Sequence, residues 1–195
     1  VNLGAAKAPF SDVANPKPLV RIADGEGAVL VEDVFFNAQY PGEILFEHDS
    51  RRDLFIRHCG GWVGAEGRCR SYRPGPNGAG RVFVEDAFLP GWVFRGQDVA
   101  AIQFNPENWA GDGSEPQVLN DGGRLAIVGF KTEGPAPYLE TRGGGLSEVC
   151  GGYNYVSATK RLPAERIPYP APDSRQRITA VADNYGEGDY AAYAL

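Results

Sequence analysis

The segment 120–155, NDGGRLAIVGFKTEGPAPYLETRGGGLSEVCGGYNY, decides the fold. It contains three short runs with strand character, Arg124–Lys131, Tyr138–Thr141 and Leu146–Cys150, and glycine clusters separate them. Because side chains alternate along a strand, the first run has two faces that are both largely apolar. The two sets are Leu125, Ile127 and Gly129 on one face and Arg124, Ala126, Val128 and Phe130 on the other. Such a strand is typical of the inside of a stacked structure.

Upstream runs repeat this pattern at a regular spacing. The sequence VLVEDVF at Val29–Phe35 is echoed 53 residues later by VFVEDAF at Val82–Phe88. The strand-like runs start at residues 29, 54, 82, 102 and 125, so the steps are 25, 28, 20 and 23 residues. A period in the twenties built from short strands and turns indicates a solenoid. The expected upstream strands are Leu19–Ala23, Ala28–Phe36, Ile44–Glu47, Leu54–His58, Arg81–Leu89, Trp92–Arg95 and Val99–Asn105.

These steps predict an all-β fold, a parallel β-helix of six to eight coils with little helix, because stacked rungs bury a core that no rung buries alone. The alternative is an antiparallel sandwich, whose strands usually recur every 8–12 residues. We expect an N-terminal loop or cap at 1–18, the β-helix at 19–160, and a Pro-rich extended tail at 161–195. The tail contains a predicted strand, Arg177–Asp183, and either caps the open end of the helix or pairs with a neighbouring chain.

Composition excludes several partners. The chain has 19 basic and 25 acidic residues, so a net charge of −6 argues against nucleic acid and anionic membranes. No apolar run approaches the roughly 20 residues of a membrane span, so we expect a soluble chain. A start at Val1 without Met is typical of a mature, trimmed or excised chain, so a signal peptide could have been removed before this residue.

The cysteines, histidines and glycine clusters do not match the patterns of a zinc site or a phosphate-binding loop. Cys59 and Cys69 either form a disulfide in an extracellular protein, or these two and Cys150 are three small buried thiols. The two histidines, His48 and His58, do not form a spaced pair with the cysteines, so we expect no zinc. The glycine clusters are too short for a phosphate loop and lead into no helix, so we expect no cofactor.

Five segments carry a resemblance to a known family. They are Val99–Glu107, Asn120–Gly123, Gly129–Glu133, Glu140–Glu148 and Gly151–Tyr155. Together they resemble the right-handed β-helices of the pectate-lyase-like superfamily, and within it the laminarinase-like exo-β-1,3-glucanases. The openings VNLG at residues 1–4 and LVRIAD at residues 19–24 look like the lead-in to the second helix of those two-domain enzymes.

The resemblance implies an extracellular protein that acts on a polysaccharide of the β-glucan type. Its expected protein partner is a preceding β-helix domain or a second copy of the chain. The resemblance also implies a general-acid glutamate after a Gly-containing strand, which Glu133 matches. A second acid is expected about one coil later, near Tyr155–Ser157, where the sequence has no carboxylate. Glu148 is the nearest substitute, although it comes too early.

An inverting glycosidase needs two carboxyl groups about 6.5–9.5 Å apart, a separation that neighbouring coils provide. The candidate catalytic residues are Glu133 and Glu148, and the candidate substrate-binding residues are Asp121, Glu140, Arg142, Trp109 and Tyr153. The aromatic members could stack on pyranose rings, whereas Trp62 and Trp92 are expected in packing roles. The charged residues could equally form surface ion pairs, and Asn105 and Asn120 could bind sugar or cap turns. The alternative function is a non-catalytic structural, filament or surface-assembly subunit.

Overall fold

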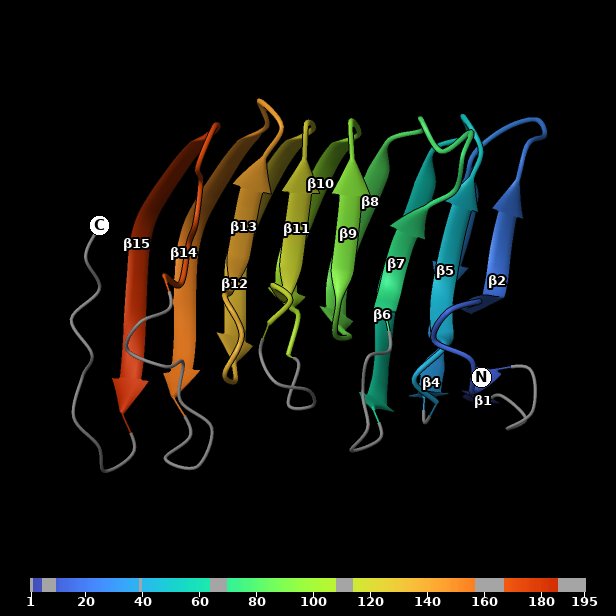
Figure 1. The fold of residues 1–195 in the computed structure, drawn as a ribbon, viewed down its shortest axis with the longest axis horizontal. Coiled ribbons are helices and arrows are strands. Elements are labelled where there is room, and N and C mark those ends of the chain that lie inside the picture. Colours follow the sequence, from blue (N-terminus) through green and yellow to red (C-terminus); the bar gives the residue numbers. More distant parts are fainter. Residues whose placement is uncertain are drawn as a thin grey trace.

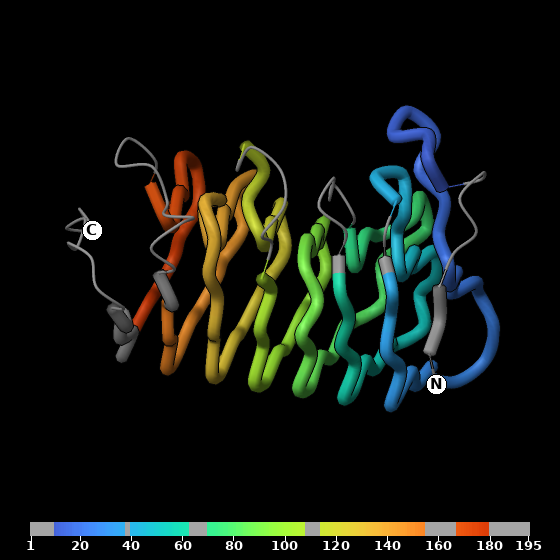
Figure 2. The backbone as a smooth tube through the Cα atoms, turned by 90° about the horizontal axis from the view of Figure 1, so that it is seen from below, coloured from blue at the N-terminus to red at the C-terminus, as the bar shows by residue number. Residues whose placement is uncertain are grey.

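The computed structural model is a parallel β-solenoid of about five turns (Figure 1). It describes residues 2–4, 10–38, 40–63, 70–107, 114–156 and 167–185. Successive turns lie side by side along one axis, from the N-terminal to the C-terminal end (Figure 2). The predicted all-β parallel architecture with little helix is therefore confirmed, and the predicted count of six to eight coils is slightly too high. Across the described ranges, no helix has the length and apolar character of a membrane span.

The chain alternates between two parallel sheets, here called sheet A and sheet B. Each turn contributes one long strand or a pair of shorter ones to sheet A and one strand to sheet B. Sheet A contains β1 (Asn2–Gly4), β3 (Val29–Glu32), β4 (Phe35–Ala38), β6 (Leu54–Val63), β8 (Val82–Phe88), β10 (Asp98–Asn105), β12 (Arg124–Glu133), β14 (Leu146–Val156) and β15 (Arg175–Tyr185). Sheet B contains β2 (Lys17–Ala23), β5 (Glu43–Asp49), β7 (Arg70–Pro74), β9 (Trp92–Arg95), β11 (Val118–Asp121) and β13 (Leu139–Arg142).

The register of sheet A explains the repeat in the sequence. Val29, Leu54, Val82, Val99 and Leu125 are aligned on consecutive strands, so the echoed segments lie two turns apart. The start predicted at residue 102 is wrong by three residues, because Ile102 aligns with Glu85 and Val128. That turn is unusually short, since only three residues join β8 to β9 and only two join β9 to β10.

The predicted assignment of side chains to the two faces of β12 is wrong after Gly129, because sheet A bends at this residue. One residue per turn has a positive φ at equivalent positions of the register, namely Asp33, His58, Asp86, Gln103, Gly129 and Gly151. A residue in this conformation shifts the alternation of side chains by one, so Phe130 is buried with Leu125 and Ile127 instead of facing out with Arg124. Val128 remains on the outer face and is 55% exposed.

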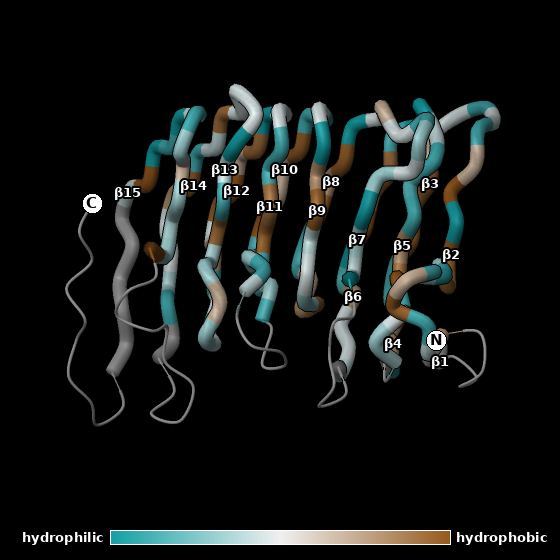
Figure 3. The backbone as a smooth tube through the Cα atoms, viewed as in Figure 1, coloured by the Kyte–Doolittle hydropathy of each residue, from teal (hydrophilic) through white to brown (hydrophobic). Residues whose placement is uncertain are grey.

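Apolar side chains from both sheets form the core between them. Hydrophobic residues recur on the strands from turn to turn (Figure 3). Trp92 lies at the centre of the core, fully buried, with its ring against Tyr72, Phe94 and Phe104. The expected packing role of Trp92 is confirmed. The sequence does not predict strands β7 and β11, because RSYRP reads as polar and VLND has only two apolar residues, followed by two that are typical of turns.

The C-terminal segment adds a further rung to the stack. The N–H groups of Tyr138 and Thr141 donate to the carbonyl oxygens of Pro168 and Pro170, at 2.7 and 3.0 Å. The chain then continues into β15, which pairs in parallel with β14 and confirms the predicted strand at 177–183. Because proline has no N–H group, the segment around Pro168 and Pro170 is poorly suited to recruit another strand.

A buried hydrogen-bond chain crosses three turns near the corner between the sheets. The side chain of Gln97 donates to the Gly80 carbonyl (3.1 Å) and to the Tyr72 hydroxyl (2.8 Å). The Tyr72 hydroxyl lies 3.0 Å from Nδ1 of His48, and Nε2 of His48 lies 2.9 Å from the Arg52 carbonyl. The chain is satisfied when a neutral His48 accepts at Nδ1 and donates at Nε2.

Acid should destabilise the protein through His48. Burial lowers the pKa of His48 below its ordinary value of 6.5, so the folded state keeps the ring neutral while the unfolded chain binds a proton. The contribution of His48 is therefore complete above pH 6.5 and is lost as the pH falls below it. We expect the free energy of unfolding to drop by up to about 1 kcal/mol between pH 7 and 5.5 from this group.

Urea unfolding at several pH values measures this effect. The drop should shrink in His48→Gln and persist in His58→Gln, because the His58 ring is 45% exposed. Equal drops in both variants would remove His48 as the cause.

Candidate functional site

Two buried glutamates meet on adjacent turns at the end of sheet A. Glu107 follows β10 and Glu133 ends β12, the strand paired with β10, and each residue is only 6% exposed. The Lys131 ammonium contacts Oε1 of Glu107 and lies 3.1 Å from Oε1 of Glu133. Two carboxylates around one ammonium leave a formal excess of one negative charge. We call Glu107, Lys131 and Glu133 the acidic cluster.

Buried polar neighbours fix the backbone beneath the acidic cluster. The Thr132 hydroxyl lies 2.8 Å from Oε1 of Gln117 and 3.1 Å from the Pro106 carbonyl, between the two glutamates. The Gln117 side chain donates to the carbonyl of Glu133 at 2.7 Å. Thr132 and Gln117 are fully buried, so the positions of both glutamates are set by the interior of the solenoid.

Two buried oxygens near the acidic cluster accept no hydrogen bond from the described residues. They are Oε2 of Glu133 and Oδ1 of Asn105, at the ends of β12 and β10. A buried acceptor left without a donor costs about 1–3 kcal/mol. Both oxygens are closed to solvent, so hydroxyl groups of a ligand could donate to them only after neighbouring side chains move.

Aromatic side chains lie near the acidic cluster, on the part of sheet A that follows the bend. Tyr153 is aligned with Lys131 and is 38% exposed, so this predicted binding residue flanks the acidic cluster. On the N-terminal side, Phe88 is aligned with Asn105, and Trp62 packs edge to face on Phe88 with the ring centroids 6.0 Å apart. Trp62 is 66% exposed, so its predicted packing role leaves most of the indole accessible. Trp109, the other predicted aromatic contact, lies outside the described residues.

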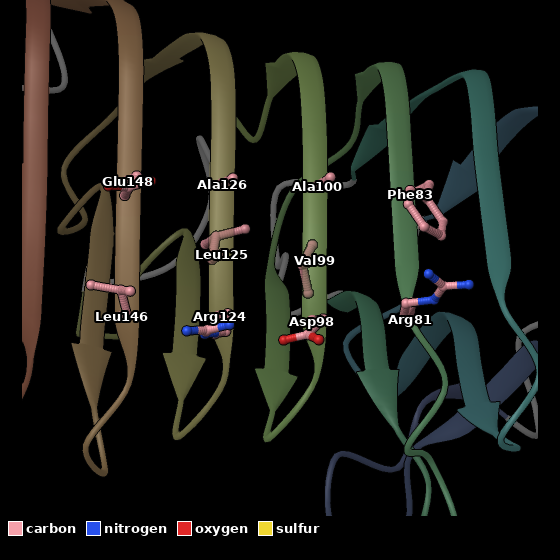
Figure 4. A pocket seen from close by; sticks show the side chains of 10 residues that line it. All are labelled: Arg81, Phe83, Asp98, Val99, Ala100, Arg124, Leu125, Ala126, Leu146 and Glu148. Carbon is pink, nitrogen blue, oxygen red and sulfur yellow. The ribbon is translucent and has the colours of Figure 1, made fainter.

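Glu148, the second predicted catalytic residue, lies before the bend of β14. It is aligned with Ala126, seven residues before Glu133 on the neighbouring strand, a separation of roughly 20 Å along the strands. Glu148 instead lines an open depression of about 400 Å³ on the outer face of sheet A (Figure 4). Ala100 and Ala126 form its floor, between Phe83 on one side and Leu146 and Glu148 on the other. Glu133 and Glu148 are therefore not brought together.

The remaining predicted binding residues lie on the outer face of sheet B. Arg142 forms ion pairs with Asp121 at 3.1 Å and with Glu140 at 3.5 Å. These are partly exposed pairs of the kind that contribute about 0–1 kcal/mol. They continue a ladder of charges that includes Arg21, Glu47 and Arg73.

Glu107 is the residue that sequence reasoning missed. It precedes Glu133 by 26 residues, which is one turn, and the spacing alone could have found it if the search had extended upstream of Glu133. Of the two predicted roles for the asparagines, the structure shows turn capping, by Asn120. Asn120 is fully buried and caps the turn at Gly123, whereas Oδ1 of Asn105 is unpaired beside the acidic cluster.

Cys59 is a buried free thiol, as the second alternative predicts, and burial raises its pKa. Cys150 is a free thiol too, but it is exposed, so the prediction that all three thiols are buried is wrong for this residue. Cys69 lies outside the described residues. Among the residues that the structure describes, no three His, Cys, Asp or Glu side chains gather in a way that could hold a metal ion.

With this geometry established, we compared the chain with known proteins. No protein-family model, no curated protein and no solved structure matches it.

Proposed function

We propose that this protein is an extracellular glycan-directed β-helix module, related to the β-1,3-glucan hydrolases of the pectate-lyase-like superfamily. The observation that supports the proposal best is the acidic cluster, in which two buried carboxylates on adjacent turns lie beside exposed aromatic rings. A carboxyl pair is the equipment of glycoside hydrolysis, and aromatic faces bind the apolar C–H surfaces of sugars.

In the proposed reaction, a protonated Glu133 donates its proton to the glycosidic oxygen while Glu107 accepts a proton from the attacking water. The two carboxyl groups now contact one ammonium, so they must move apart to the roughly 6.5–9.5 Å of an inverting reaction when Lys131 withdraws. The bond between the anomeric carbon and the leaving oxygen breaks, and a bond from the water oxygen to that carbon forms. Glu133 is suited to the acid role because its Oε2 has no hydrogen-bond donor among the described residues. The step requires general acid and base groups on opposite sides of the scissile bond.

Lys131 controls access to the two carboxylates. Its ammonium lies between them, so a sugar and a water molecule can enter only after this side chain swings away. The Lys131 side chain is 35% exposed, and a long flexible stem allows such a movement. In the resting protein, Lys131 stabilises the two buried negative charges.

Reducing-sugar release from a soluble β-1,3-glucan tests the proposal. We expect Glu133→Gln to reduce the release at least about 100-fold, the usual contribution of a general acid, and Glu107→Gln to do the same. Glu26→Gln, which removes an exposed carboxylate in the loop before β3, should retain full activity. Thermal unfolding of each variant shows whether the fold is retained.

Two results would argue against hydrolysis. Unchanged release in Glu133→Gln would remove this residue from the mechanism. A wild-type protein that is stabilised against heat by the glucan but releases no sugar would be a binding module. Absence of both effects would leave the non-catalytic assembly role.

A further inference from the structure

The exposed apolar side chains of this protein are concentrated on one surface. Among the described residues, nine large hydrophobic side chains are exposed, and seven of them belong to strands of sheet A. These seven are Leu30, Phe35, Trp62, Ile102, Val128, Leu146 and Tyr153. None lies on sheet B, whose outer face carries the ladder of ion pairs. Sheet A carries ion pairs as well, of Arg57 with Glu32 and Glu85 and of Arg81 with Asp53. Its outer surface before the bend therefore combines charges with the exposed apolar residues Leu30, Ile102, Val128 and Leu146, the mixed composition of a protein interface.

We call the outer surface of sheet A before the bend the A face. Its shape is self-complementary, because it has a ridge beside a depression. Phe55 and Phe83 form a ridge on β6 and β8, with their rings stacked 4.6 Å apart and nearly parallel. The next two strands carry only Ala100 and Ala126 at the aligned positions, and these alanines form the floor of the depression (Figure 4). A twofold axis between β8 and β10 would place the ridge of one copy over the floor of the other.

The charges on the A face follow the same division. Its N-terminal half, from β3 to β8, has five acidic residues and two arginines, a net charge of −3, with His58 taken as neutral. The acids are Glu32, Asp33, Asp53, Glu85 and Asp86, and the arginines are Arg57 and Arg81. The C-terminal half, from β10 to β15, has three arginines and two acids, a net charge of +1. They are Arg124, Arg175 and Arg177, with Asp98 and Glu148.

We propose that the A face binds a second copy of this chain, with the two solenoid axes antiparallel and related by a twofold axis. In this arrangement the acidic half of each copy faces the basic half of the other, and each phenylalanine ridge meets an alanine floor. An isologous interface uses the same patch on both subunits, so a surface with complementary halves is what it requires. Sheets that pack face to face lie about 10 Å apart, close enough to bury the exposed Ile102 and Val128.

The mass in solution tests the proposal first. Light scattering during size-exclusion chromatography should give a mass that rises with concentration and reaches twice the chain mass of 21.0 kDa by about 100 µM. Ala126→Arg fills the floor of the depression with a large charged side chain and should weaken dimerisation at least 10-fold. Arg95→Glu reverses an exposed charge on sheet B and should leave the dimer unchanged.

A pair of charge-reversed variants tests the antiparallel arrangement. Glu32→Lys with Glu85→Lys changes the acidic half from −3 to +1, and Arg124→Glu with Arg177→Glu changes the basic half from +1 to −3. Each double variant then has two halves of like sign and should be monomeric. An equimolar mixture of the two should form a heterodimer, because opposite charges again face each other.

Several outcomes would overturn the proposal. The first is a monomeric wild type over the whole concentration range. The second is a dimer that survives both Ala126→Arg and the charge reversals, since it would use another surface. The third is a pair of monomeric double variants that fail to combine, which would exclude the antiparallel arrangement. Circular dichroism of each variant confirms that the β-structure is retained, so loss of dimer is not loss of fold.

Discussion

Replacing Trp92 with alanine is expected to lower the free energy of unfolding by about 3–5 kcal/mol, one of the two largest effects in this protein. The indole is fully buried in sheet B and packs edge to face on Phe104 of sheet A, with the ring centroids 4.9 Å apart. Its Nε1–H donates to the Leu89 carbonyl at 2.6 Å. The substitution would open a cavity between the sheets and leave that carbonyl without its donor.

Urea denaturation of wild type and variant measures the change, provided that both unfold in a single transition. Trp62→Ala is the matched control, because it deletes the same side chain from the surface and should cost about 1 kcal/mol or less. Equal losses in the two variants would show that Trp92 does not hold the two sheets together.

Replacing Asn120 with alanine is expected to cost about 2–4 kcal/mol, because one side chain contacts four buried partners. Its Nδ2 has two N–H groups and lies within hydrogen-bonding distance of three acceptors, the carbonyls of Gly123 and Leu146 and the Ser147 hydroxyl, at 3.2, 3.1 and 2.9 Å. Its Oδ1 accepts the Gly123 N–H at 3.2 Å. These bonds join the β11–β12 turn to the next turn, so the loss should weaken the stacking of two rungs.

The same denaturation experiment measures the Asn120 effect. The exposed Asn15, whose side chain bonds only to Asp12 in the described structure, provides the control, and Asn15→Ala should change stability by less than about 1 kcal/mol. A small effect of Asn120→Ala would show that water replaces the missing amide. In the proposed reaction, reducing-sugar release from the glucan should persist in the folded fraction of Asn120→Ala. Asn120 is buried inside the solenoid and does not belong to the acidic cluster.

The turn-by-turn repeat was predictable from the sequence, because apolar residues at the start of each strand of sheet A recur about once per turn. The aligned residues Val29, Leu54 and Val82 each begin a strand of sheet A, and the rungs differ little enough for the echo of VLVEDVF to remain visible. The bend was not predictable, since four of its six positions are Asp33, His58, Asp86 and Gln103, which are not glycine. Without the bend, the inward side of Phe130 could not be assigned.

The candidate site was predictable only in part, because proximity in a solenoid depends on register. Glu133 was singled out from the resemblance, but its neighbour Glu107 lies one turn earlier and was not considered. Glu148 lies close in sequence, yet the seven intervening positions along the strands place it on another part of sheet A. Lys131 carried no signal, since only the structure shows that its ammonium lies between two glutamates.

A single distance tests the stacked parallel fold most directly. Spin labels on cysteines introduced in place of Arg21 and Arg142, with the native cysteines replaced, lie on the outer face of sheet B five strands apart. With about 4.8 Å between neighbouring strands, double electron–electron resonance should give a narrow distribution centred near 25 Å. A separation beyond about 35 Å, or a broad distribution without that peak, would contradict six strands stacked in order from β2 to β13.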